Sequence, residues 1–324
     1  MADENRKRVD ATTLTGVPAT MMWTLRNRAV EASRPDGTLV DPLAVRLYET
    51  LDYPYENFGK PSQSHALRAR AFDDEIRAFL ADHPGGTVVA LGEGLQTSYW
   101  RIGDPDVRWV SIDLPEVVAL RRQLLPDEPH VTTLAVSALD RSWMDHVDTG
   151  RGVFVSAEGL LMYLPADESL SLIGDCARRF PGGRMMFDSV PRWFSRKTQK
   201  GLRIHGDYTV PPMPFHLSAG EAAELPARVP DVAFTREVAL PLGRGLWGSA
   251  FLRRLSDLRP LRDSRPTLTL CGFAADSPAE CTHVDARTLD CRLSAPGAPC
   301  YRCGRPIMSY KISVGPTECG PLKR

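Results

Sequence analysis

The sequence predicts an α/β fold: a mostly parallel sheet of about seven strands with helices on both faces. Apolar, β-branched runs alternate with helically spaced segments from residue 87 onward. One of these runs ends in Gly-x-Gly, as strands that lead into a ligand-binding turn often do. The chain has 324 residues, 43% of them hydrophobic, which is enough for a large core.

The first eighty residues carry helical signals. Asp41-Pro42 is typical of an N-cap followed by proline in the first turn, and the segment 64–80 repeats apolar residues at helical spacing. We therefore expect residues 1–80 to form an N-terminal helical cap, and residues 81–270 to form the core domain.

The core shows five strand signals in succession, at Thr87–Leu91, Val107–Ile112, Val131–Val136, Val153–Ala157 and Met185–Phe187. Helices are predicted at Leu114–Leu125, Pro165–Phe180 and Ser218–Arg228, and further strands at Val232–Leu240 and Thr267–Leu270. This order favours a parallel sheet, in which ligands bind beyond the carboxyl ends of the strands.

The turn after the first core strand has the features of a nucleoside site. Gly92 and Gly94 would let a ligand approach the backbone, and Asp113 follows about 20 residues later, as does the ribose-binding acid of dinucleotide folds. Thr97 replaces the third glycine that usually seats a pyrophosphate, which favours a phosphate-free nucleoside such as S-adenosylmethionine. The alternative role for Asp113 is to cap the helix that begins near Pro115.

Acidic residues also follow the next two strands. Asp140 could bind the adenine amino group, and Glu158 could bind the ammonium group of methionine. The alternatives are an N-cap ahead of Trp143 for Asp140 and a solvated loop acid for Glu158.

Several motifs resemble the leucine carboxyl methyltransferase family, in its bacterial branch of O-methyltransferases of polyketide and other secondary metabolism. The resemblance spans about residues 14–270 and rests on Leu14–Thr20, Asp41–Ala44, Leu67–Asp73, Leu91–Thr97, Asp113–Glu116 and Ala157–Tyr163. It implies a Rossmann-like class I methyltransferase that uses S-adenosylmethionine. It also implies that Arg68, with Arg70 as the weaker alternative, binds the methionine carboxylate, although Arg68 could be an ordinary helix-face arginine. Gln96 stands where the family usually has Asp and Glu93 where it has a small residue, which we interpret as a subgroup signature.

The resemblance implies methyl transfer to a carboxylate or hydroxyl of a small molecule. Such a reaction needs no metal. His65, His205 and His216 are possible bases, but the sequence does not favour any of them, so the catalytic residues stay unknown at this point. Acceptor specificity is expected in the N-terminal helices and in a lid insertion at residues 190–217. The competing hypothesis is a catalytically silent cofactor-binding or regulatory protein on the same fold.

The charge composition limits the classes of partner that the protein is expected to bind. Forty basic and forty acidic residues give a formal net charge of zero, which disfavours nucleic acid, including RNA methylation, and anionic membranes. The N-terminus is polar and has no apolar leader, so we expect a cytoplasmic protein. The sequence does not indicate an oligomeric state.

The C-terminal segment differs in composition from the core. Six of the seven cysteines lie from Cys271 onward, where hydrophobic periodicity also ends. We expect residues 271–324 to be a Cys-rich, disordered tail, so that truncation after Leu270 would preserve the fold. The alternative is a zinc site that uses Cys300 and Cys303, although a second Cys-x-x-Cys pair is missing.

Overall fold

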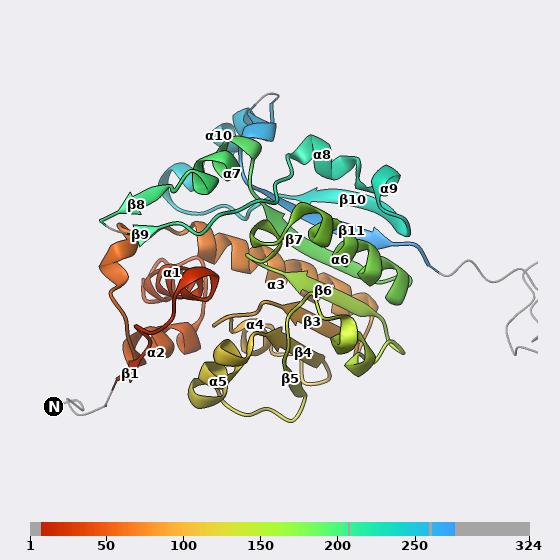
Figure 1. Ribbon diagram of the computed structural model, residues 1–324, viewed down its shortest axis with the longest axis horizontal. Helices are drawn as coiled ribbons and strands as arrows, with labels where there is room; N and C mark the ends of the chain where they lie inside the picture. Colours follow the sequence, from red (N-terminus) through yellow and green to blue (C-terminus); the bar gives the residue numbers. More distant parts are fainter. Residues whose placement is uncertain (1–7, 207, 259–260, 276–324) are drawn as a thin grey trace, which may run out of the picture. The chain divides into compact units, whose positions relative to one another are not determined.

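The computed structural model describes residues 8–206, 208–258 and 261–275. Its main element is a seven-stranded sheet in the order β10-β11-β7-β6-β3-β4-β5 (Figure 1). The strands are β3 (Thr87–Leu91), β4 (Arg108–Asp113), β5 (Val131–Ala135), β6 (Val153–Ala157), β7 (Arg184–Ser189), β10 (Val232–Val238) and β11 (Thr267–Phe273). The first five run parallel, and β11 pairs antiparallel with both β7 and β10. The predicted fold class, a mostly parallel sheet, is confirmed.

Strand β3 pairs with β4 on one side and with β6 on the other. The strand order therefore reverses beside β3. In open α/β sheets such a reversal opens a crevice beyond the carboxyl ends of the strands, where ligands bind.

Helices cover both faces of the sheet. Because side chains alternate along a strand, Val89 of β3 packs in a cluster with residues of α6 (Ala166–Arg179), whereas Val88 packs with residues of α3 (Ser64–Asp82). The predicted N-terminal cap thus contributes α3 to the sheet layers themselves. No helix in the described part of the chain is both long and apolar enough to cross a membrane.

The remaining N-terminal elements are β1 (Val9–Asp10), α1 (Gly16–Ala32), α2 (Pro42–Thr50), β2 (Leu51–Asp52) and the 3-10 turn η1 (Tyr55–Phe58). Asp41 is the N-cap of α2, as predicted, and accepts a hydrogen bond from the Ala44 amide at 2.9 Å. The helices α4 (Ser98–Ile102) and α5 (Pro115–Leu124) follow β3 and β4, and the 3-10 turns η2 (Arg141–His146) and η3 (Leu161–Tyr163) follow β5 and β6.

The insertion at 190–217 contains α7 (Arg192–Gln199) and a small hairpin, β8 (Arg203–His205) and β9 (Tyr208–Thr209). Tyr208 brings this insertion against the N-terminal helices, with its ring centroid 4.8 Å from Phe58 and 6.2 Å from Trp23. The lid role stays a prediction.

The helix predicted at Ser218–Arg228 is divided into α8 (Ala219–Ala223) and α9 (Leu225–Arg228). A capping box between Ser218 and Glu221 begins α8, and Pro226 lies in the first turn of α9. Proline is tolerated there but not in the interior of one continuous helix, which explains the break. The elements η4 (Gly245–Gly248), α10 (Ala250–Ser256) and η5 (Arg262–Ser264) precede β11.

The predicted domain boundary after Leu270 falls inside a strand. Strand β11 continues through Phe273, and both Cys271 and Phe273 are buried in the main core. The compact unit that contains the sheet ends at Ser277. The change of composition at Cys271 therefore does not mark the end of the fold. The predicted disorder of the tail and the Cys300/Cys303 zinc site lie outside the described residues.

This boundary yields a test. Truncation after Leu270 should remove the buried Phe273 side chain and the last pairings of β11, costing about 3–5 kcal/mol. The melting temperature should fall by at least about 5 °C. Truncation after Ser277 keeps all of β11 and is the matched control, expected to melt within about 2 °C of the full chain. Equal melting of the two truncated chains would contradict this boundary.

Candidate functional site

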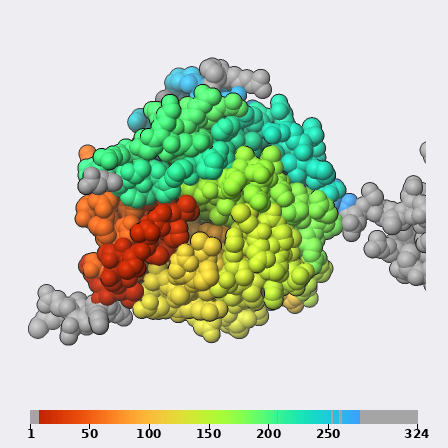
Figure 2. Space-filling model, viewed as in Figure 1, coloured from red at the N-terminus to blue at the C-terminus, as the bar shows by residue number. Residues whose placement is uncertain are grey.

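A cavity of about 290 Å³ lies at the carboxyl ends of β3, β4 and β6. Figure 2 shows the surface hollowed beside α1, between its red residues and the yellow and green segments. The cavity lining includes five of the six predicted site residues, namely Arg68, Gly92, Gly94, Asp113 and Glu158. Residues far apart in sequence thus meet at the edge where a parallel sheet binds its ligands.

The turn after β3 requires both of its glycines. Gly92 and Gly94 have φ of +59° and +54°. A Cβ atom on Gly92 would lie 2.9 Å from the Leu160 side chain, and one on Gly94 would lie 3.1 Å from Met21 Cβ. The glycines therefore let the backbone of the turn lie close to the cavity wall.

Asp113 ties this turn to the end of β4. Its Oδ2 accepts a hydrogen bond from the Gly94 amide at 2.6 Å, and its Oδ1 accepts one from the Leu114 amide at 2.8 Å. Burial raises the pKa of this carboxyl group, against the effect of these two amides. Leu114 is the N-cap of α5 and no side chain caps that helix, so Asp113 does not have the alternative helix-capping role.

Arg68 of α3 joins two acidic strand ends. Its Nε donates to Glu158 Oε1 at 2.9 Å, and its Nη1 donates to Asp188 Oδ2 at 2.7 Å. Asp188 also accepts the Gly159 amide at 2.6 Å. We call Arg68, Glu158 and Asp188 the acidic triad, because two buried carboxylates share one guanidinium.

Burial raises the pKa of Glu158, and although Arg68 opposes this, Asp188 reinforces it. For Arg68, burial alone would lower the pKa, but the two carboxylates outweigh it, so Arg68 stays charged. Glu158 is therefore not the solvated loop acid of the alternative interpretation. The family resemblance predicts that Arg68 binds a ligand carboxylate. If it does, its guanidinium must bind this group while it also pairs with two protein carboxylates.

The residue that supports the glycine turn on its other side, Arg121, was not predicted from the sequence. Arg121 of α5 forms an ion pair with Glu93 at 2.8 Å and donates to the carbonyl oxygens of Gly94 and Gln96. Glu93, which departs from the family pattern, also accepts a hydrogen bond from the Trp109 indole at 3.2 Å. Its charge is thus paired inside the fold.

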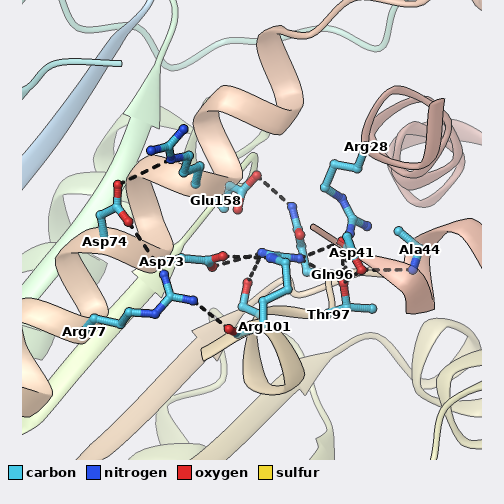
Figure 3. Close-up of polar contacts among 12 residues, drawn as sticks. Arg28, Asp41, Ala44, Asp73, Asp74, Arg77, Gln96, Thr97, Arg101 and Glu158 are labelled. Carbon is cyan, nitrogen blue, oxygen red and sulfur yellow. Dashed lines mark hydrogen bonds and ion pairs between the residues drawn. The ribbon is translucent and has the colours of Figure 1, made fainter. Parts of the chain in front are cut away.

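A second buried ion network links the N-terminal helices to the exit of this turn (Figure 3). Asp41 pairs with Arg28 at 2.6 Å and with Arg101 at 2.9 Å, and Arg101 pairs with Asp73 at 2.7 Å. Thr97 donates to Asp41 at 2.7 Å. Two cations and two carboxylates balance, as buried charges require. The sequence analysis noted Thr97 only because it replaces the third glycine of the motif. In the structure its side chain has a structural role in this network.

Asp140 is the predicted site residue that the structure does not bring to the cavity. Its exposed side chain accepts a hydrogen bond from the Ser142 amide at 3.0 Å and caps η2, which is the alternative that the sequence left open. Ser137 and Ala138 of the same loop line the cavity instead.

The three histidines considered as bases do not line this cavity. His65 is half-buried, and its Nδ1 lies 2.7 Å from Asn27 Nδ2. Desolvation, reinforced by the charge of Arg68, lowers its pKa. Arg70, the weaker candidate for the ligand carboxylate, lies 3.9 Å from Asp74 on the same helix and does not line the cavity either.

Comparisons with known proteins identify a family that the chain matches. The leucine carboxyl methyltransferase family model matches residues 21–177. The tetracenomycin polyketide synthesis O-methyltransferase TcmP of Streptomyces glaucescens is 31% identical over 254 residues, covering 76% of this chain and 88% of that protein.

Two further similarities are weaker. The S-adenosyl-L-methionine-dependent methyltransferase dpfgK of Gibberella zeae is 27% identical, covering 76% of this chain and 91% of that protein. The solved structure of N-methyltransferase NodS from Bradyrhizobium japonicum WM9 is 14% identical, with a TM-score of 0.39, covering 77% of this chain and 98% of that chain.

The match to TcmP spans most of both chains, and the family model covers the segment that supplies Arg68, the glycine turn, Asp113 and Glu158. The chain belongs to the leucine carboxyl methyltransferase family and is an S-adenosylmethionine-dependent methyltransferase.

Proposed function

We propose that this enzyme transfers the methyl group of S-adenosylmethionine to a carboxylate or hydroxyl oxygen of a small molecule of secondary metabolism. The observation that carries the proposal is that one cavity joins the glycine turn and Asp113 with Arg68 and Glu158. The name of the relative TcmP, a polyketide O-methyltransferase, supports the acceptor class. We also propose that the enzyme is cytoplasmic and that it has no nucleic-acid partner. The zero net charge supports the absence of a nucleic-acid partner.

The residues present fit the cofactor in two parts of the cavity. Asp113 would accept hydrogen bonds from the ribose hydroxyls, and the turn without a Cβ at residues 92 and 94 leaves room for the nucleoside. At the other part, the acidic triad carries one more negative than positive charge, which suits an ammonium group. The hydrogen bonds of Arg68 given above use Nε and Nη1, so Nη2 would serve the methionine carboxylate.

The cofactor supplies an electrophilic sulfonium methyl group. The contribution of the protein is therefore to hold the acceptor oxygen in line with the methyl group and to exclude water. Met21, Pro18 and Leu164 give the cavity an apolar wall on the side of α1 and the loop after β6. Burial raises the pKa of Tyr163 in this wall to about 12, so its phenol stays protonated at neutral pH and would orient an acceptor rather than remove its proton.

A carboxylate acceptor is the form of the reaction that these residues support best. A carboxylate is already nucleophilic at neutral pH, whereas an alcohol benefits from a base. The carboxylates that line the cavity are held by Arg68, by Arg121 and by backbone amides. None of the described lining residues is a histidine.

The silent-protein hypothesis rested on Glu93 and Gln96. Glu93 is paired with Arg121, and Gln96 donates to Glu158 at 2.7 Å. Both departures thus have partners in an otherwise complete site, which favours an active enzyme.

The proposal is tested by incubating the protein with S-adenosylmethionine and an extract of its host organism and then searching for methylated products by mass spectrometry. We expect a product heavier by one methyl group, labile to mild base if it is an ester and stable if it is an ether. Binding of S-adenosylhomocysteine without any methylated product would favour the silent protein.

Asp113→Asn should weaken binding of every ligand that contains adenosine by about 1.5–3 kcal/mol, because a charged acceptor for ribose is lost. Calorimetric titration with S-adenosylhomocysteine and with 5′-methylthioadenosine, which lacks the amino acid part, provides the measurement. A thermal melt of the variant checks the fold, since Asp113 also holds two backbone amides. Unchanged affinity for both ligands would contradict the ribose assignment.

The raised pKa of Glu158 predicts a pH effect. An ammonium ligand needs the ionised carboxylate, so affinity for S-adenosylhomocysteine should fall as the pH is lowered and Glu158 takes up a proton, and this fall should begin at a higher pH than for an ordinary glutamate. Glu158→Gln should bind this ligand more weakly at pH 8 and show a flatter profile. In the same variant 5′-methylthioadenosine should bind as in the wild type, and an equal loss for both ligands would sink the assignment.

A further inference from the structure

Gln96 lies at a fixed position in the cavity wall. The residue is 8% exposed, and it lines the cavity together with Arg68 and Glu158. The backbone is held on both sides, because the Gln96 amide donates to the Glu93 carbonyl at 3.0 Å and the Gln96 carbonyl accepts from Arg121 at 3.1 Å. The side chain therefore starts from a rigid point of the glycine turn.

The orientation of the Gln96 amide follows from its neighbour. Nε2 donates to Glu158 Oε1 at 2.7 Å (Figure 3). Turning the amide by half a rotation would place its oxygen against a carboxylate oxygen, and two acceptors would then face each other. Glu158 thus fixes Oε1 of Gln96 on the other side of the amide.

Oε1 of Gln96 is buried and has no hydrogen-bond partner among the described residues. A buried amide oxygen without a donor costs about 1–3 kcal/mol. Such a group in a cavity wall indicates a ligand that supplies the missing donor.

The charges around Gln96 indicate which donor this is. Both hydrogen bonds given above for Glu158 end on Oε1, so its Oε2 is an additional acceptor near the same amide. An ammonium group has three donors and a positive charge, which matches two oxygen acceptors beside the net negative acidic triad.

We propose that Gln96 is a cofactor-binding residue whose Oε1 accepts a hydrogen bond from the α-ammonium group of S-adenosylmethionine. Its Nε2 at the same time holds Glu158, so one amide both orients the acidic partner and contacts the ligand. Aspartate at this position would have no N–H to donate to Glu158 and would add a third carboxylate to the triad. The inference rests on the proposed placement of the methionine part at Arg68 and Glu158.

The test compares two ligands that differ only in the ammonium group. Calorimetric titration of the full chain uses S-adenosylhomocysteine and its deamino analogue, in which hydrogen replaces the α-ammonium. In Gln96→Met, the dissociation constant for S-adenosylhomocysteine should rise at least about tenfold, whereas that for the analogue should stay unchanged. Gln96→Leu should behave in the same way, and Gln199→Met, an exposed glutamine on α7, should change neither value.

A role exercised only through Glu158 is separated by repeating the titration in the Glu158→Gln background. A direct contact predicts that Gln96→Met still weakens S-adenosylhomocysteine selectively there, and disappearance of that selectivity would overturn the inference. Equal weakening of both ligands, or no weakening, would also overturn it. Failure of the proposed function looks different, because the wild-type chain itself would then bind both ligands equally or transfer no methyl group.

Discussion

The site depends on the ion pairs made by the partly buried guanidinium of Arg68. This side chain extends from α3 to Glu158 after β6 and to Asp188 in β7, and so it joins the N-terminal helices to two strand ends. Gly159 lies between these acids with φ of +71°, and a Cβ atom there would lie 3.3 Å from Arg68 Nη2. Because burying three charges is costly unless they are paired, loss of Arg68 would leave two carboxylates uncompensated. The same imbalance of charge suits the site to a cation.

The glycine turn is supported independently of that contact. Arg121 holds its carbonyl oxygens and Glu93, Asp113 holds the Gly94 amide, and the network around Asp41 holds Thr97 at its end. These supports come from α5, from β4 and from the start of α2. A turn fixed from three directions is preorganised, so little ordering is required when a nucleoside binds.

Local sequence was sufficient where a pattern has one structural solution. Strands β3 and β6 have the predicted bounds, because each is a short apolar run that ends at glycine or a polar residue. Gly92, Gly94 and Asp113 were predicted from their spacing, and Glu158 from its place after a strand. Arg68 came from the family resemblance, since a helix gives no sign of which arginine faces a cavity.

The predictions that the structure corrected also have physical explanations. Asp188 was overlooked because the strand was predicted to end at Phe187, two residues before its actual end at Ser189. Strand β11 was cut at Leu270 because Cys271 and Gly272 accompany a change of composition, although packing against β7 and β10 continues. Asp140 was placed in the site by analogy with its neighbours, but the loop after β5 turns into η2 and uses that side chain as a cap. Tertiary contacts decided the cases of Asp188 and β11, and a local hydrogen bond to the Ser142 amide decided the case of Asp140.

The most direct measurement of the central claim is an experimental structure of the full chain with bound S-adenosylhomocysteine. The account predicts that the ribose hydroxyls lie within hydrogen-bond distance of Asp113 and that the ammonium group lies beside Glu158. A ligand bound in the reverse direction, with adenine beside Arg68, or bound outside this cavity, would contradict it.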